Sequence, residues 1–281
     1  AVGAVGILVL SVNSQLLSPR PRLNPVSNLR AAVDGARTFA SPGSRVTITE
    51  GARESMQSTY ALDPLIREQI GDRPVSIDPW EIGVAWAYEL NWSPVPVFQN
   101  YNAWTSALDE LNAEAIEASD GPELVLRHDL PPELSQFAGR AIDGRFAAWD
   151  PPAQALATLC HFAPVRTTDR WQLLERVDDR CGAPRPVASV ESEYGAVVDV
   201  PETRPGSVLF VRIDGVEPTG LERLQSLLFR ASQRTAFLGD AAYRVVPGTA
   251  RDGLLLRGDE SVTGSGSFAQ APQAETIQLI G

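Results

Sequence analysis

The alternation of apolar and polar positions between residues 75 and 127 predicts strands and helices in turn. Short apolar runs of strand length alternate with longer segments whose apolar side chains recur at helical spacing. The expected strands are Val75–Ile77, Val95–Phe98 and Glu123–Arg127, and the expected helices are 79–90 and 106–116. Because short connections favour right-handed crossovers, this order predicts a parallel or mixed sheet.

The first of these helices has a start signal in the residues Asp78-Pro79-Trp80-Glu81. Asp78 fits the N-cap, Pro79 the first helical position and Glu81 the third. The two carboxylates could instead serve as a general acid and base, but capping accounts for their spacing. Apolar side chains on two sides of this helix predict that Trp80 and Trp86 are core residues.

Further elements are expected on both sides of this region. Ser106 with Asp109 forms a capping pattern for the second helix, and its predicted inner face is Leu108, Leu111, Ala115 and Ile116. Upstream, we expect helices at 28–36 and 51–70, broken at Asp63-Pro64, and a β-branched strand at Arg45–Ile48. Downstream, we expect a helix capped by Asp150 and ending near His161, then a hairpin over 162–177.

Beyond Pro184 the pattern changes to short alternating runs typical of an antiparallel β-rich module. The expected strands are Gly195–Val200, Ser207–Ile213, Ala242–Val246, Gly253–Arg257 and Thr276–Ile280, while Leu221–Arg230 fits a helix or a strand. The predicted fold is therefore an α/β domain with a parallel or mixed sheet, residues 28–184, followed by a smaller antiparallel β-rich domain, residues 185–281.

The first ten residues, AVGAVGILVL, are wholly apolar. A bilayer span needs about twenty residues, so the segment fits the end of a transmembrane helix, a signal-peptide remnant or a buried strand. The polar, proline-rich stretch Ser18–Ser27 fits a tether to the folded part. We therefore expect residues 1–27 to be a membrane-proximal segment, with membrane attachment at or before the N-terminus.

Composition limits which partners and which cofactor or metal sites are expected. The formal net charge is −11, and all 24 basic residues are Arg without a basic cluster, which argues against nucleic acid as a partner. The chain has no GxSxG, HExxH or GxGxxG motif and only two His residues, so neither a cofactor nor a metal site is expected.

Cys160 and Cys181 fit either a disulfide or two buried thiols. The even count and the export-like N-terminus favour the disulfide. It would close a loop of about 20 residues and stabilise the fold by about 3 kcal/mol.

Polar side chains gather at the ends of the three predicted strands of the α/β domain. They are Asp78 after the first, Gln99, Asn100, Tyr101 and Asn102 after the second, and His128 and Asp129 after the third. Ligands of open α/β sheets bind beyond the carboxyl ends of strands, so these residues are the predicted ligand-binding site. The competing interpretation is loop closure, since amides also bond their own backbone.

Three stretches carry a resemblance to a known family: PWEIGVAWAYELNWSPVPVFQNYNAWTSALDELNAEAI, IDGRFAAWDPPAQALATLCHF and AYRVVPGTARDGLLL. They resemble the extracytoplasmic carboxyl-terminal region of a family of bacterial, often actinobacterial, polytopic membrane proteins of unassigned function. The similarity covers roughly residues 70–260, with the specific core W-x-P-x-P-V-F-Q-x-Y, and departs at Trp104, where Tyr is more usual. The membrane part of such proteins resembles lipid-linked sugar transferases, which implies a membrane-anchored place in the cell envelope.

Two functions of different classes follow. The first is a non-catalytic extracytoplasmic domain that recognises a glycan or an envelope protein. The second is an envelope glycan-processing enzyme, a glycosyltransferase or glycoside hydrolase, in which two of Asp78, Glu81, Asp129, Asp143 and Asp150 act as acid and base. Binding is favoured, because capping or turn formation explains most of these acids.

Overall fold

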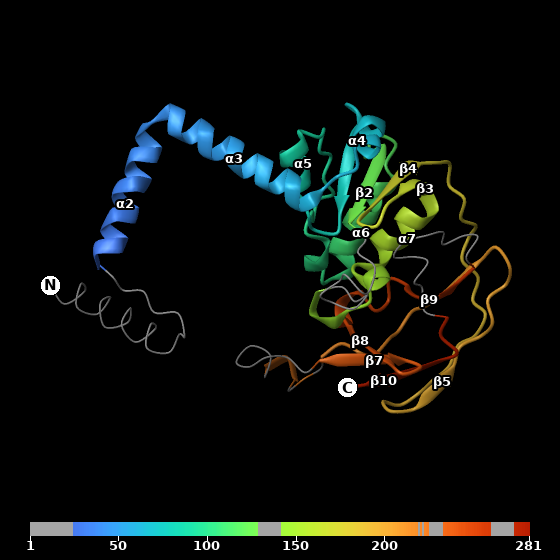
Figure 1. Cartoon of the computed structure of the whole chain (residues 1–281). Helices are drawn as coiled ribbons and strands as arrows, with labels where there is room; N and C mark the ends of the chain where they lie inside the picture. The colour runs from blue at the N-terminus through green and yellow to red at the C-terminus, as the bar shows by residue number, and fades with distance from the viewer. Residues whose placement is uncertain (1–24, 129–141, 219, 221, 225–232, 260–272) are drawn as a thin grey trace. The chain divides into compact units, whose positions relative to one another are not determined.

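The computed structural model describes residues 25–128, 142–218, 220, 222–224, 233–259 and 273–281. The chain divides into two compact units, residues 1–55 and 56–281. In the first unit the described residues form helix α2 (Pro25–Ala40) and most of helix α3 (Pro42–Tyr60), in shades of blue in Figure 1. The predicted break is confirmed, because α4 (Pro64–Ile70) starts afresh with Asp63 as its N-cap.

The strand predicted at Arg45–Ile48 is wrong, because these residues lie within α3. Pro42 is the first residue of this helix, and the Ser41 hydroxyl accepts a hydrogen bond from the Ser44 amide at 3.3 Å. Strand propensity expresses packing on a pleated, half-buried surface rather than a backbone preference. Val46 and Ile48 are exposed, so the packing that would favour a strand is missing here.

The sheet of the α/β region has four strands in the order β1-β2-β4-β3. They are β1 (Val75–Asp78), β2 (Leu124–His128), β4 (Trp171–Arg176) and β3 (Phe162–Thr167). The pair β1-β2 is parallel, and the pairs β2-β4 and β3-β4 are antiparallel. The mixed sheet and the hairpin predicted over 162–177 are thereby confirmed.

The strand predicted at Val95–Phe98 is wrong, because the segment has no strand structure and β2 lies directly beside β1. Pro94 and Pro96 have no N–H to donate to a ladder. The Asn112 side chain serves the backbone instead: its Oδ1 accepts from Val97 N at 2.8 Å and its Nδ2 donates to Val97 O at 3.1 Å.

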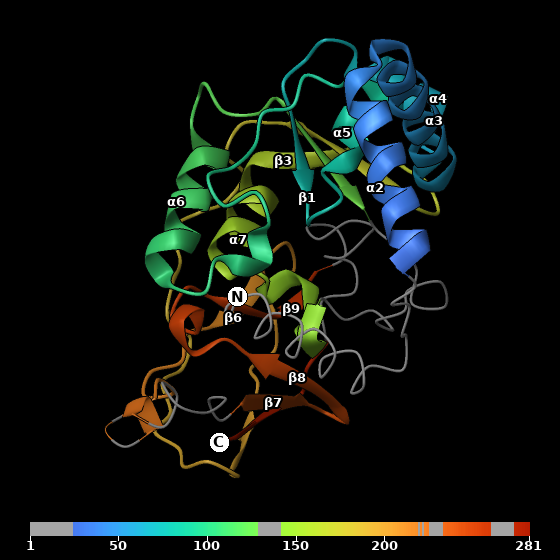
Figure 2. The ribbon, with the colours of Figure 1, turned by 90° about the vertical axis from the view of Figure 1, so that its left-hand side faces the viewer.

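Helices pack on both faces of this sheet. Alternation along β2 turns Leu124 and Leu126 to a core cluster with residues of α4 and α5 (Gly83–Tyr88). Val125 points to the other face, into a cluster with Ile116 of α6 (Ser106–Glu117) and Ala157 of α7 (Pro152–His161). Figure 2 shows α6 and α7 side by side. The sheet is thus a three-layer scaffold whose strand ends can carry a site.

The predicted helix start at Asp78 is wrong. Asp78 is the last residue of β1, and α5 begins only at Gly83. The Asp78 carboxylate instead forms an ion pair with a side chain of β2, so it is not available to cap a helix. Trp86 on α5 is 42% exposed, so its expected place in the core is also wrong, whereas Trp80 is partly buried.

The predicted inner face of α6 needs correction too. Leu108 and Leu111 are exposed, while the buried positions are Asp109, Asn112 and Ile116. The N-cap is Thr105, one residue before the expected Ser106. A hydrophobic pattern could not identify this face, because two of its three buried side chains are polar.

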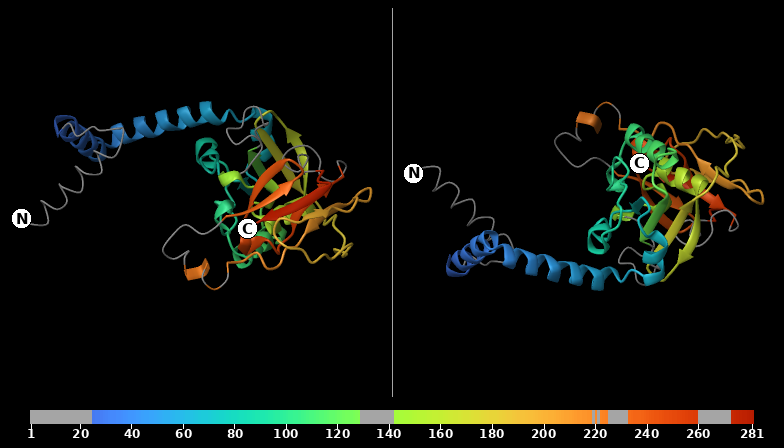
Figure 3. Two further views of the ribbon diagram at one scale, coloured as in Figure 1. Left: turned by 90° about the horizontal axis from the view of Figure 1, so that it is seen from below. Right: turned by 90° about the horizontal axis from the view of Figure 1, so that it is seen from above.

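The C-terminal region is antiparallel, as predicted. One sheet has the order β5-β10-β7-β8, and β6 pairs with β9 in a second. Its strands, orange and red in Figures 1 and 3, are β5 (Val197–Asp199), β6 (Val208–Val211), β7 (Arg234–Leu238), β8 (Ala241–Val245), β9 (Leu254–Gly258) and β10 (Thr276–Ile280). Strand β7 was not predicted. Of Leu221–Arg230 only residues 222–224 are described, and they are helical.

The predicted disulfide is confirmed: Cys160, near the end of α7, is bonded to Cys181. Within the described residues, no helix combines the length and apolarity needed to cross a membrane. The apolar segment 1–10, residues 18–24 of the predicted tether and the predicted site residue Asp129 lie outside the described residues. The tether prediction is wrong for residues 25–27, which belong to helix α2.

Candidate functional site

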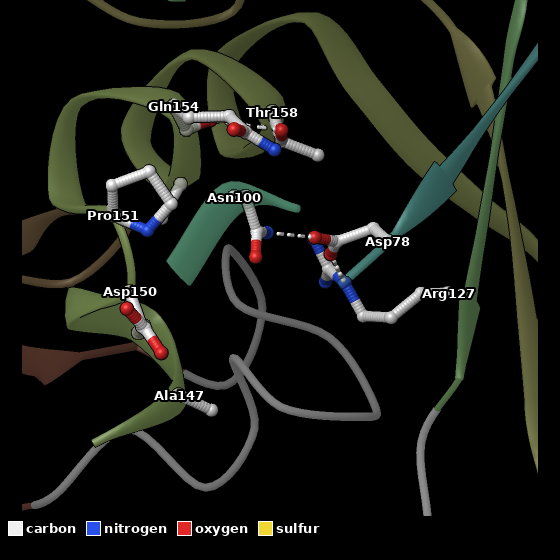
Figure 4. A pocket seen from close by; sticks show the side chains of 10 residues that line it. Asp78, Asn100, Arg127, Ala147, Asp150, Pro151, Gln154 and Thr158 are labelled. Atoms are coloured by element: carbon white, nitrogen blue, oxygen red, sulfur yellow. Dashed lines mark hydrogen bonds and ion pairs between the residues drawn. The ribbon is translucent and has the colours of Figure 1, made fainter. Parts of the chain in front are cut away.

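A polar pocket lies where the end of β1, strand β2, the short 3-10 turns η1 (Asn100–Asn102) and η3 (Ala147–Trp149), and the start of α7 meet (Figure 4). Its polar lining residues are Asp78, Asn100, Arg127, Asp150, Gln154 and Thr158. The cavity among them has a volume of about 20 Å³. The interior therefore has room for one or two groups of water size.

The first half of the pocket is an ion pair between neighbouring strands. The parallel register of β1 and β2 places Asp78 beside Arg127. Arg127 Nε lies 2.7 Å from Asp78 Oδ2, and the two side chains are only 5% and 16% exposed. Asn100 Nδ2 donates to the other carboxylate oxygen, Oδ1, at 2.6 Å. Asp78 is thus fixed by two partners, one from the sheet and one from η1.

The second half is a buried ion pair between Arg145 and Asp150, each with a side chain 3% exposed. Arg145 also donates to the backbone oxygen of Tyr101 at 3.0 Å, which links the pair to η1. Burial raises the pKa of Asp150 to about 7; Arg145 acts in the opposite direction, and Asp78 adds to the rise. Burial also lowers the pKa of Arg145, against the effect of Asp150.

Two hydrogen-bond acceptors in this pocket have no donor among the described residues. Asn100 Oδ1 and Asp150 Oδ2 are buried and receive no hydrogen bond from the part of the chain that the structure describes. The residues are only 3% and 6% exposed. Figure 4 shows both side chains at the pocket, from η1 and from the segment before α7. Buried acceptors usually have a partner, so the pocket is chemically suited to receive donors.

The structure separates the predicted site residues. Asp78 and Asn100 line the pocket. Asn102 is exposed and its Nδ2 donates to Gln99 Oε1 at 3.3 Å, which is the loop closure considered as the alternative. The Tyr101 ring packs edge-on against Trp80 with centroids 5.8 Å apart, so its hydroxyl is not among the lining groups.

His128 does not line the pocket either. Its Nδ1 lies 3.1 Å from Glu81 Oε1, and its ring lies against Trp171 with centroids 4.7 Å apart. This arrangement accounts for His128 and Glu81 as a local polar contact at the end of β2. Asp143, another candidate acid, pairs with Arg244 at 2.9 Å.

Sequence reasoning missed Arg127 and Gln154 as pocket residues, and Arg145 as the partner of Asp150. One signal was present: Arg127 is a charged residue at the end of an otherwise apolar predicted strand. Such a residue is rarely buried without a partner. The partner itself depends on the strand register, which the sequence pattern does not determine.

The start of α7 is held by an acid from another helix. The prediction that Asp150 caps α7 is wrong, since that carboxylate pairs with Arg145. Asp109 of α6 accepts the amides of Ala153 and Gln154, both at 2.9 Å, and is fully buried. Unpaired amides at a helix start need acceptors, and here α6 supplies them.

The Asp109 carboxyl is strongly perturbed. Burial raises its pKa to about 7, the two backbone hydrogen bonds act in the opposite direction, and the neighbouring Asp252 adds to the rise. Ser106 donates to Asp252 Oδ1 at 2.6 Å, which ties α6 to the loop before β9. Asn112 Nδ2 donates to Gln154 Oε1 at 2.8 Å, so this network also supports one wall of the pocket.

Among the described residues, one group of His, Cys and acidic side chains is close enough to share a metal: Cys160, Asp179 and Cys181. The two sulfurs are joined in the disulfide and cannot act as thiolate ligands.

No protein-family model, curated protein or solved structure matches this chain. The resemblance to a polytopic membrane family therefore stays a prediction, and the interpretation of the site depends on its geometry.

Proposed function

We propose that the chain is a non-catalytic extracytoplasmic domain of a cell-envelope membrane protein, and that its pocket recognises a small polar group of a glycan or of an envelope partner. The observation that carries the proposal is a pair of buried acceptors, Asn100 Oδ1 and Asp150 Oδ2, to which no described residue donates. A ligand that supplies donors would remove the cost of leaving them unmatched, about 1–3 kcal/mol each.

The proposed extracytoplasmic, membrane-attached location has separate support. The Cys160–Cys181 disulfide suits an oxidising compartment such as the exterior of the cytoplasmic membrane. Membrane attachment is proposed from the apolar segment 1–10 and from the family resemblance. The acidic net charge of −11 fits a partner other than nucleic acid.

One observation favours the alternative, a glycan-processing enzyme. Asp78 and Asp150 line the same pocket, and the pKa of Asp150 is raised to about 7. Acid and base roles in glycoside hydrolysis require two carboxyl groups in different environments. However, each of these acids is already paired with an arginine, Asp78 with Arg127 and Asp150 with Arg145, which favours binding over proton transfer.

The test is a screen of the full chain against envelope glycans, with Asn100→Ala and a matched control, Asn102→Ala. Asn102 has the same side chain two residues away but is exposed outside the pocket. We expect binding that Asn100→Ala abolishes and Asn102→Ala preserves. Binding unaffected by Asn100→Ala would overturn the proposal. Release of reducing sugar by the wild-type chain, lost in Asp150→Asn, would favour the enzyme instead.

A further inference from the structure

We infer that the pocket binds the neighbouring hydroxyls of a neutral sugar and discriminates against acidic sugars and amino sugars of the same size. This inference rests on the proposed binding function and names the class of ligand. It follows from which polar atoms of the pocket are already engaged and which are not.

The unmatched atoms of Asn100 and Asp150 are acceptors. Asn100 donates through Nδ2 to Asp78 Oδ1, so the amide orientation is set and the carbonyl oxygen is the atom left over. Asp150 uses Oδ1 in its pair with Arg145, which leaves Oδ2. A carbonyl oxygen has no proton to give, and Oδ2 of Asp150 has none once this carboxyl is ionised, as pH rises past about 7. Both atoms therefore require a ligand with donors.

The charges around these acceptors disfavour an anion. Arg127 is paired with Asp78, and Arg145 with Asp150, so each arginine has a carboxylate as its immediate partner. A ligand carboxylate at the pocket would lie near two carboxyl groups and would face the two unmatched acceptors. Like charges at short range in a buried site repel strongly.

The same pairing disfavours an ammonium group. An amino sugar would supply donors, but its positive charge would come near the guanidinium of Arg127, which lines the pocket. It would also lose its water shell, and the paired acids offer no uncompensated negative charge in return. A hydroxyl brings a donor without a charge, so it satisfies the acceptors at the lowest desolvation cost.

Pocket size sets how much of the sugar enters. The cavity volume of about 20 Å³ fits one or two hydroxyl groups rather than a whole ring. The apolar lining residues Ala147, Ala148, Pro151 and Ala155 offer surface to the C–H groups beside those hydroxyls. The pocket therefore matches one edge of a pyranose or furanose, with the ring at the mouth.

The experiment compares three methyl glycosides of one sugar series, the neutral hexoside, its uronate and its 2-amino derivative, by titration calorimetry on the full chain. We expect the neutral glycoside to bind and the other two to bind at least about tenfold more weakly. In the wild-type protein, the neutral glycoside should shift the side-chain amide NMR signal of Asn100 and leave that of Asn102 unchanged. This readout needs no variant, so it stands even if Asn100→Ala does not fold.

The possible outcomes distinguish a failure of this inference from a failure of the proposed binding function. If the uronate or amino glycoside binds as well as the neutral one and shifts the Asn100 signal, the inference is wrong while the proposed binding function holds. If none of the three binds at millimolar concentration, the inference is wrong and glycan recognition at this pocket loses its support. If the neutral glycoside binds without shifting the Asn100 signal, the site lies elsewhere and both are overturned.

Discussion

Two buried carboxyl groups, those of Asp109 and Asp150, lie beside the start of α7. Asp109 caps the helix from α6, and Asp150 precedes it and pairs with Arg145. For both groups burial is the largest cause of a pKa raised to about 7. In an unfolded chain an Asp titrates near its ordinary pKa of about 3.9. Between about pH 4 and pH 7 the folded state therefore holds protons that the unfolded state has released.

This difference predicts a pH-dependent stability with a definite sign. Raised folded-state pKa values stabilise the fold in acid, and that contribution decreases as pH rises from about 4 and is lost once pH passes about 7. A rise of about 3 in each pKa, at about 1.4 kcal/mol for each pKa unit, corresponds to roughly 4 kcal/mol of unfolding free energy for each of the two groups. Urea unfolding at a series of pH values between 4 and 8 measures it.

The matched variant is Asp109→Asn, which cannot ionise and should flatten the decrease. The control is Asp169→Asn, on the exposed turn between β3 and β4, which should leave the pH profile unchanged. An identical profile for the wild type and Asp109→Asn would show that Asp109 does not hold a proton in the folded state near neutral pH.

The tryptophans give a second prediction, which reverses the expectation from the sequence. Trp86 is 42% exposed, whereas Trp171 is fully buried and its Nε1 donates to Tyr60 O at 2.8 Å. We expect Trp86→Ala to cost less than about 1 kcal/mol of unfolding free energy, and Trp171→Ala about 3–5 kcal/mol. Equal losses of unfolding free energy in the two variants, measured by chemical denaturation, would contradict this prediction.

Among the predicted site residues, the sequence identified the two that lie at a strand end and in the adjoining turn, Asp78 and Asn100. It could not identify their partners, because Arg127 is 49 positions from Asp78 and the contact depends on the β1-β2 register. It also misassigned Asp150 as a cap. Local capping patterns describe one helix end, while the acid that caps α7 comes from another helix.

Secondary structure was predicted best where a segment's own pattern agreed with its surroundings. The hairpin β3-β4 and the strands β5, β6, β8, β9 and β10 fall within or beside the expected ranges. The failures at 45–48 and 95–98 were runs of strand-forming residues whose backbone groups are satisfied in other ways, by helix α3 and by Asn112. Hydrophobic pattern alone does not reveal such substitutes.

The disulfide ties the C-terminal part of α7 to the segment after β4, and it gives a third prediction. Removing it in Cys160→Ser/Cys181→Ser should lower the free energy of unfolding by about 3 kcal/mol, because it closes a loop with a sequence separation of 21. A reductant should destabilise the wild type by a similar amount and leave the double variant unchanged. Wild-type protein insensitive to the reductant under denaturing conditions would contradict this role.

The largest core cluster among the described residues crosses the predicted domain boundary at 184/185. Phe146, Trp149 and Leu159 from the first region pack with buried residues of β7, β8 and β9. Trp149 Nε1 also donates to Leu255 O at 2.7 Å. Residues 56–281 form one compact unit by their contacts. The packing therefore suggests that the two regions depend on each other, whereas the sequence showed only their different strand patterns.

This dependence is the last prediction. A chain of residues 28–184 would expose the Phe146, Trp149 and Leu159 side chains that the C-terminal strands cover. We expect it to lose the near-ultraviolet circular dichroism of packed aromatic residues and the sharp thermal transition of the full chain. Residues 56–281, which keep the whole cluster and lack only the first unit, should retain both signals and serve as the control. A cooperative transition in 28–184 would instead support two independent domains with the boundary at 184/185, because a region that unfolds cooperatively on its own must have a sufficient core of its own.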